Sequence, residues 1–248
     1  STLPFVRETS MHDSSTGPPI GRFTERRGWV LAVLCWMTLW PGHPLSAGEE
    51  AEISHTRQWD FDSIAPGTLP SSFVIGTLFD GRPAGEWKIL ITDRAKSPSQ
   101  VLGQLQPRGT DQAHKLLLLQ GTDSGSIDVE VSYLAVSGKA DVGGGLVWHA
   151  TDDRNYYLLR ASLVEQKVRL YRVVKGVPQI VKQLDRPLSA NGWHKLRIVQ
   201  SGCELKALYD DAVLFRVCDQ TFSNGRIGLW TKADAVTYFD DLVLRRLD

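Results

Sequence analysis

The sequence lacks an excess of charge of either sign. Its 248 residues include 28 Lys and Arg and 28 Asp and Glu, so the formal net charge is zero at pH 7. No run of five or more like charges occurs. Because nucleic-acid phosphates are bound by basic surfaces, this balance argues against nucleic acid as the main partner.

Helical periodicity and the signatures of several enzyme classes are also lacking. After residue 47, no long stretch repeats apolar residues at the 3.6-residue period of a helix. We find no Ser-His-Asp arrangement, no phosphate-binding loop and no nucleotide signature. The sequence therefore gives no support for a nucleotide-dependent enzyme or a triad hydrolase.

Cysteine is scarce, with three residues in the whole chain. Cys35 lies in the apolar N-terminal segment, whereas Cys203 and Cys218 flank a predicted hairpin whose turn is Asp210-Asp211. That turn places Cys203 opposite Cys218, at the separation of about 4.5–5.5 Å expected for opposed positions, so we predict a disulfide. A bulge would shift this register, and two buried free thiols are the alternative. No further Cys or His stands at the spacing of zinc ligands.

The N-terminal part has the order of a secretory signal peptide. Basic residues precede an apolar run, Gly28–Trp40, and small residues follow it, with cleavage expected after Ala47. The run of about 13 residues is shorter than the roughly 20 that span a membrane. We therefore predict an N-terminal extension and signal peptide over 1–47, an exported chain that is periplasmic or extracellular, and no membrane span after cleavage. An uncleaved anchor is the alternative.

The rest of the chain reads as β-strands. Short runs of Val, Ile, Leu, Tyr and Trp recur at intervals of roughly 8–14 residues, separated by Gly, Pro, Asp or Asn. The predicted strands are 58–61, 72–75, 87–92, 100–106, 115–120, 126–137, 143–150, 156–162, 167–174, 179–184, 193–200, 203–209, 212–218, 225–231 and 236–244, with a turn at 232–235 between the last two. So many strands in about 200 residues indicate a double-sheet sandwich or jelly roll.

No linker or internal repeat divides the chain after Ala47, so we predict a single β-sandwich domain over 48–248. The stretch Glu49–Gln58 is interpreted as a lead-in to the first strand. We expect the first and last strands to be neighbours, because the ends of such domains often lie close together.

Six motifs occur along the chain in a characteristic order. They are Asp128-Val-Glu-Val-Ser132, Gly144-Gly-Leu-Val-Trp148, Asn155-Tyr-Tyr-Leu-Leu-Arg160, Val168-Arg-Leu-Tyr171, Gly192-Trp-His-Lys-Leu-Arg197 and Gly228-Leu-Trp-Thr-Lys-Ala-Asp234. Together they resemble the bacterial exported proteins of the concanavalin A-like lectin/glucanase superfamily and, within it, the 3-keto-disaccharide hydrolase family. The resemblance covers Asp60 to Leu247 and implies a jelly roll of two antiparallel sheets that handles a carbohydrate, often in the periplasm. Family members commonly have Arg at the position of His149.

A sugar-binding groove is the leading functional hypothesis. Aromatic rings stack on the apolar faces of sugars, while Arg, Asn and His bond their hydroxyl groups. The predicted substrate-binding residues are Trp148, His149, Arg160, Tyr171, Trp230 and Lys232. The alternative is that the aromatic residues only fill the core. Lys232 either borders the groove or forms a salt bridge with Asp234 in the turn after Trp230.

Paired carboxylates are the usual catalytic groups of glycoside hydrolases. Asp128 and Glu130 share one strand face about 6.8 Å apart. Their sequence lacks the flanking Glu residues of laminarinase-like enzymes, and Ile127, Val129 and Val131 are expected to point inward. We therefore interpret the two acids as part of an outer sheet face and assign no catalytic residue.

Four aspartates offer a candidate calcium site. Asp60 and Asp62 lie near the first strand and Asp240 and Asp241 on the last, so they converge if those strands are neighbours. Calcium takes six to eight oxygen ligands. The resemblance implies one structural Ca²⁺ there, and strand-end capping is the alternative.

These observations predict an exported jelly roll that binds or processes a saccharide. As an enzyme, it would hydrolyse or eliminate at a 3-keto-glycoside, with Arg160 and His149 orienting the substrate. The alternatives are a non-catalytic glycan-binding module and a structural interaction domain of the cell envelope.

Overall fold

A computed structural model describes residues 53–78 and 85–247. The predicted N-terminal extension over 1–47, with its signal peptide, lies outside these residues. The described residues form fifteen β-strands and no helix. Accordingly, this part of the chain contains no helix long and apolar enough to cross a membrane.

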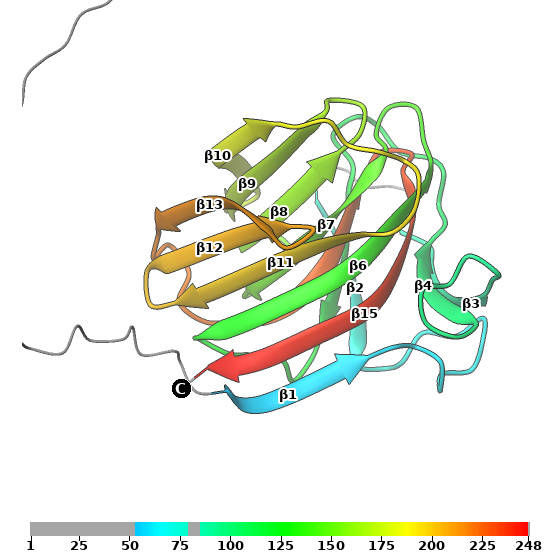
Figure 1. The fold of residues 1–248 in the computed structure, drawn as a ribbon, viewed down its shortest axis with the longest axis horizontal. Helices are drawn as coiled ribbons and strands as arrows, with labels where there is room; N and C mark the ends of the chain where they lie inside the picture. Colours follow the sequence, from blue (N-terminus) through cyan, green and yellow to red (C-terminus); the bar gives the residue numbers. More distant parts are fainter. Residues whose placement is uncertain (1–52, 79–84, 248) are drawn as a thin grey trace, which may run out of the picture. The chain divides into compact units, whose positions relative to one another are not determined.

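One sheet, called sheet A, is built from eight strands that pair antiparallel (Figure 1). From edge to edge its order is β13 (Ala212–Cys218), β12 (Glu204–Tyr209), β11 (His194–Ser201), β6 (Ile127–Ser137), β15 (Val236–Leu247), β4 (Gln100–Gln104) and β3 (Trp87–Ile91), with β1 (Ile53–Trp59) paired to β15. The first and last strands are therefore neighbours, as predicted. β15 can hold both β4 and β1 because β4 pairs near its start and β1 pairs nearer its end.

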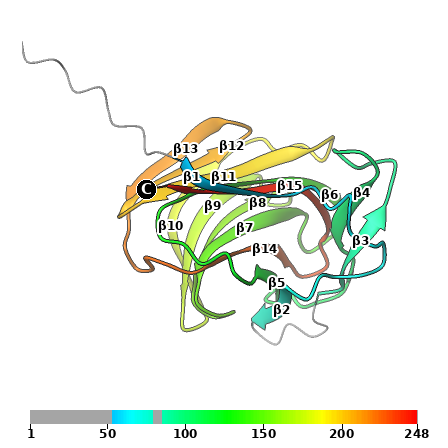
Figure 2. The same ribbon diagram turned by 90° about the horizontal axis from the view of Figure 1, so that it is seen from below.

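The second sheet, sheet B, has seven antiparallel strands. Its order is β10 (Val177–Asp185), β9 (Lys167–Val174), β8 (Tyr156–Ser162), β7 (Gly143–Ala150), β14 (Arg226–Lys232), β5 (His114–Leu119) and β2 (Phe73–Leu78). Figure 2 shows strands β7, β8, β9 and β14 beneath β11, β12 and β15 of sheet A. Two antiparallel sheets stacked in this way confirm the predicted all-β sandwich.

Successive side chains along a strand point to opposite faces of the sheet. Val129 and Val131 of sheet A and Leu146 and Leu159 of sheet B belong to the core between the sheets. A second apolar cluster covers the outer face of sheet B; its members are Leu116, Leu118, Val147, Ala150, Tyr156, Leu158, Val173 and Trp230. Strands β5, β7 and β8 are consequently buried on both faces, and polar groups placed on the outer face must find partners there.

The first strand begins earlier than predicted. Glu49–Gln58 was expected to be a lead-in, but β1 begins at Ile53. Arg57 pairs with Leu244, and Ile53 with Leu247. The strand extends because the end of β15 continues to Leu247 and offers backbone partners to residues whose side chains give no strong strand signal.

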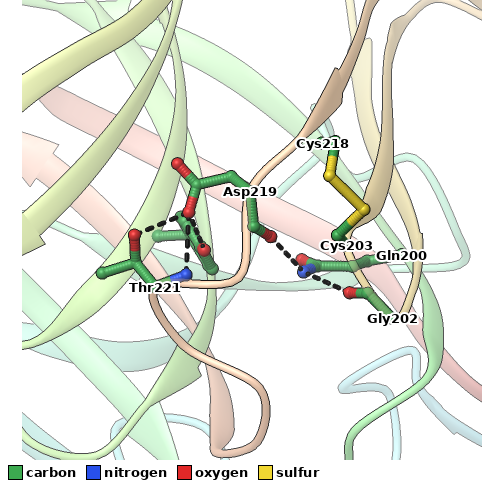
Figure 3. Close-up of a disulfide and its surroundings, with 7 residues drawn as sticks. Gln200, Gly202, Cys203, Cys218, Asp219 and Thr221 are labelled. Carbon is green, nitrogen blue, oxygen red and sulfur yellow. Dashed lines mark hydrogen bonds between the residues drawn. A yellow bond between two sulfur atoms is a disulfide. The ribbon is translucent and has the colours of Figure 1, made fainter.

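The β12–β13 hairpin contains the predicted disulfide, shown in Figure 3. Asp210 and Asp211 form the turn with positive φ values of 48° and 64°, as a two-residue hairpin turn requires. The predicted register is wrong, because Leu214 is an extra residue in β13 and Glu204 therefore faces Cys218. Cys203 stands one residue beyond, with its Cα 4.6 Å from that of Cys218, close enough for the bond.

We expect the bond to stabilise the hairpin by restricting the unfolded chain. Replacing both cysteines with serine, Cys203→Ser with Cys218→Ser, should lower the free energy of unfolding by about 2–4 kcal/mol. Chemical denaturation with and without a reductant measures this. The wild type should lose stability in reductant and the double variant should not. Equal stability of both proteins in oxidising buffer would contradict the prediction.

Candidate functional site

A pocket of about 360 Å³ lies on the outer face of sheet B. It spans most of the sheet, from the edge strand β10 to β5. Its lining residues are Asp111, Gln112, His114, Leu158, Arg160, Tyr171, Pro178, Trp230 and Lys232. Four of the six predicted substrate-binding residues therefore meet here: Arg160, Tyr171, Trp230 and Lys232.

Strand register explains how Arg160 and Trp230 meet. Gly145 of β7 pairs with Arg160 of β8 on one side and with Trp230 of β14 on the other. All three positions face outward, so the glycine separates the two side chains without filling the space between them. A Cβ at Gly145 would lie 2.6 Å from Leu158 Cδ1 and 3.1 Å from Trp230 Cε3. The absence of a side chain lets the guanidinium of Arg160 lie over the indole, 5.6 Å from the ring centroid.

The guanidinium of Arg160 is held by two carboxylates. Nη2 donates to Asp141 Oδ1 at 2.7 Å and Nη1 donates to Glu165 Oε1 at 2.8 Å. Ser162 adds a hydrogen bond to Asp141 at 3.1 Å, and Arg169 forms an ion pair with Glu165. Arg160 and Asp141 are 4% and 1% exposed. A charged group so deeply buried needs these partners, and they fix its orientation.

Electrostatics keep this network ionised. Burial acts to lower the pKa of Arg160, but the charge of Asp141 and the hydrogen bonds that Arg160 donates to both carboxylates raise it above its usual range. Burial acts to raise the pKa of Glu165, and the bonds from Arg160 and Arg169 lower it below its usual range. The Nε atom of Arg160 has no hydrogen-bond partner among the described residues and is the unused donor of the guanidinium.

His114 was not predicted from the sequence, yet it lines the pocket beside Trp230. The two rings meet edge-on with centroids 5.0 Å apart. Burial, assisted by the positive charges of Lys232 and Arg160, lowers the pKa of His114 to about 3. The imidazole is therefore neutral at neutral pH. Its sequence position, directly before the apolar run Lys115–Leu119, gave no sign of a binding role.

Lys232 lies at the end of β14 and is half-buried. The alternative of a turn salt bridge with Asp234 is not supported. Asp234 instead accepts backbone N–H bonds from Lys139, Ala140 and Asp141, at 2.8 to 3.1 Å. Among the described residues, the ammonium of Lys232 has no hydrogen-bond or ion-pair partner. It faces a pocket whose one lining carboxylate, Asp111, is exposed.

Trp148 and His149 do not line the pocket. Trp148 belongs to the core between the sheets, where it stacks on Tyr157 and donates Nε1–H to Gln200 at 2.7 Å. The ring nitrogens of His149 lie 2.7 Å from the Gly125 carbonyl oxygen and 3.1 Å from that of Phe222. Strand β7 is irregular here, with a φ of 48° at His149 and a shift in its pairing with β14. The side chain of His149 therefore points away from the outer-face positions that lead to the pocket.

The acid pair Asp128 and Glu130 occupies the outer face of sheet A, as interpreted from the sequence. Arg197 binds Asp128 through two hydrogen bonds of 2.8 and 2.6 Å. Arg245 donates to Glu130 at 2.9 Å. Both carboxylates are therefore paired with arginines, and the four side chains form an ion-pair network that joins β6, β11 and β15.

The four aspartates of the candidate calcium site bind protein donors instead. Asp240 accepts backbone N–H bonds from Lys96 and Ser97 at 3.1 and 3.0 Å, and the Lys96 ammonium lies 3.2 Å from Asp241. Asp62 and Asp60 accept backbone N–H bonds from Gln100 and Asp62 respectively. Within 53–78 and 85–247, no group of three or more His, Cys, Asp or Glu could hold a metal ion. The ammonium of Lys96 supplies the positive charge beside Asp241, and the donors around the four aspartates do not fit calcium.

Comparison with known proteins identifies the fold. No protein-family model and no curated protein matches this sequence. The carbohydrate-binding module CBM66 from Bacillus subtilis superposes with a TM-score of 0.56 at 18% identity, covering 70% of this chain and 95% of the module. The catalytic domain of an endo-1,3-beta-glucanase (laminarinase) from Thermotoga petrophila RKU-1 gives 0.52 at 9% identity, covering 81% and 99%.

The fold is a concanavalin A-like jelly roll. At these identities the likeness establishes the architecture alone, and it confirms the fold class predicted from the strand pattern. The narrower resemblance, to the 3-keto-disaccharide hydrolase family, is a hypothesis that these comparisons leave open.

Removing one charge from the buried network should destabilise the fold. The substitution Asp141→Asn leaves Arg160 with a single carboxylate in a dry environment, so we expect a loss of about 3–5 kcal/mol in the free energy of unfolding. Denaturant titration measures it. Asp185→Asn removes the exposed partner of Lys167 and should cost less than about 1 kcal/mol. Equal effects of the two variants would show that Arg160 does not depend on Asp141.

His114 should make stability depend on pH. Its pKa is about 3 in the folded state and near 6.5 when unfolded, so the unfolded chain binds the proton first as the pH falls. Stability should drop below pH 6.5, by about 2 kcal/mol between pH 7.5 and 5 from this group, and the contribution should level off below pH 3. The variant His114→Phe keeps a ring against Trp230 and should lack this part of the slope. Identical slopes for both proteins would refute it.

Proposed function

We propose that this protein binds a saccharide in the pocket on the outer face of sheet B. The observation that carries the proposal is the meeting of Trp230, Tyr171 and Arg160 in one pocket of about 360 Å³. That volume falls in the range of small-molecule sites, roughly 300–1,000 Å³. Aromatic walls with a few polar groups are the arrangement that sugar rings require.

Each lining residue has a role in this proposal. Tyr171 is half-buried and presents its ring near Pro178 on the neighbouring strand, so it offers an accessible stacking surface. Trp230 forms the floor under the guanidinium of Arg160. Gln112 and Lys232 border the opposite side with side chains that can bond sugar hydroxyls.

The carboxylates favour binding over hydrolysis. Glycoside hydrolysis ordinarily uses two carboxyl groups across the scissile bond. Among the described residues that line the pocket, Asp111 is the single carboxylate, since Asp141 and Glu165 are engaged by Arg160. The narrower proposal of a reaction at a 3-keto-glycoside rests on the motif resemblance and would place proton transfer at Asp111.

Two further features are consistent with this setting. The disulfide between Cys203 and Cys218 suits an oxidising compartment, which supports the proposal that the chain is exported. CBM66, which shares the fold, is by name a carbohydrate-binding module, and this supports a saccharide as the ligand here.

A glycan array probed with the purified chain tests the proposal. We expect binding to a defined set of glycans and a loss of about tenfold or more in affinity for Tyr171→Ala, because the stacking surface is removed. Tyr238→Ala is the matched control, since Tyr238 is also half-buried but lies on β15 of sheet A.

Absence of binding to any glycan would overturn the proposal and favour a structural interaction domain. Equal losses for Tyr171→Ala and Tyr238→Ala would show that the pocket is not the site.

A further inference from the structure

We propose that the saccharide bound in this pocket is anionic, carrying a carboxylate or a sulfate ester, and that the ammonium of Lys232 binds that charge. The inference deepens the proposed function and rests on it. It follows from the distribution of charged groups around the pocket.

Most charges near the pocket are already balanced. Arg160 and Arg169 face Asp141 and Glu165, so two positive groups meet two negative groups. Every one of these four residues takes part in an ion pair with another member of the set. Arg160 therefore contributes no net charge to the pocket, although its Nε–H is a donor without a partner in the described part of the chain.

Lys232 is the positive group that remains. Its strand position places it next to His114, with which it pairs across β14 and β5. No described residue accepts a hydrogen bond from its ammonium. Lys232 is half-buried and lines the pocket, so an anionic acceptor supplied by a ligand would form a charge-assisted hydrogen bond with its ammonium.

The surrounding groups do not replace that acceptor. His114 is neutral at neutral pH, so it neither balances nor repels the charge. Asp111 is exposed at the rim, where solvent weakens any attraction to Lys232. A carboxylate or sulfate on the ligand would enter the pocket beyond Asp111 and could accept hydrogen bonds from the ammonium of Lys232.

The experiment begins with the full chain on a glycan array holding neutral, uronate-containing and sulfated glycans. The strongest acidic ligand is then compared by calorimetry with its uncharged parent, the carboxyl-reduced form for a uronate or the desulfated form for a sulfate ester. We expect the acidic glycan to bind at least tenfold more tightly than its parent.

Variants assign the effect to Lys232. The substitution Lys232→Gln should weaken binding of the acidic glycan by about tenfold to a hundredfold and weaken binding of the uncharged parent much less, because Gln can still bond a hydroxyl group. Lys206→Gln removes the same charge from β12 of sheet A and should change neither affinity. Thermal unfolding of both variants checks that they are folded.

The outcomes are distinguishable. Preference for uronates or for sulfated glycans identifies the source of the charge, and either supports the inference. Neutral glycans that bind as tightly as acidic ones would overturn it and leave the proposed function intact. Equal weakening of acidic and neutral ligands by Lys232→Gln would also overturn it. If no glycan binds at all, the proposed function itself fails.

Discussion

The site depends on one buried guanidinium. Arg160 is buried beside the apolar cluster on the outer face of sheet B, and such a group is tolerated only with close counter-charges. Asp141, before β7, and Glu165, after β8, supply them from two different turns. These bonds set the position of the guanidinium over Trp230. Gly145 lies between Arg160 and Trp230 and has no side chain, which leaves room for their contact. The pocket floor is therefore defined by electrostatics as much as by packing.

The jelly roll brings together residues that are distant in sequence. The pocket draws on β5, β8, β9, β10 and β14, which the strand order of sheet B brings close together, with β7 between β8 and β14. The two faces of sheet B have different roles, the inner face in packing and the outer face in forming the pocket. The inner face holds the sheets together through residues such as Leu146 and Leu159, which leaves the outer face free to carry Tyr171 and Lys232.

Alternation along the strands predicted much of this arrangement and explains its limits. The period of two places Arg160 and Leu158 on one face of β8 and Leu159 on the other, and in the structure Arg160 and Leu158 line the pocket while Leu159 lies in the core. The same alternation places Trp148 on the face of Leu146, which is the core face. The prediction of Trp148 as a groove residue did not take this alternation into account. His149 and the Cys203–Cys218 register could not be predicted, because each follows from an irregularity in pairing that depends on the neighbouring strand. Gly145 and His114 gave no local signal, since their importance lies in what the adjacent strands present.

The bulge at Leu214 has a consequence for the outermost strand of sheet A. β13 pairs with β12 on one side only, so its other side offers unpaired backbone groups. An extra residue twists such a strand out of register, and a covalent link to Cys203 prevents it from straightening. A distorted and tethered edge strand is a poor template for a strand from another molecule, so the cross-linked hairpin disfavours strand addition at the β13 edge of sheet A.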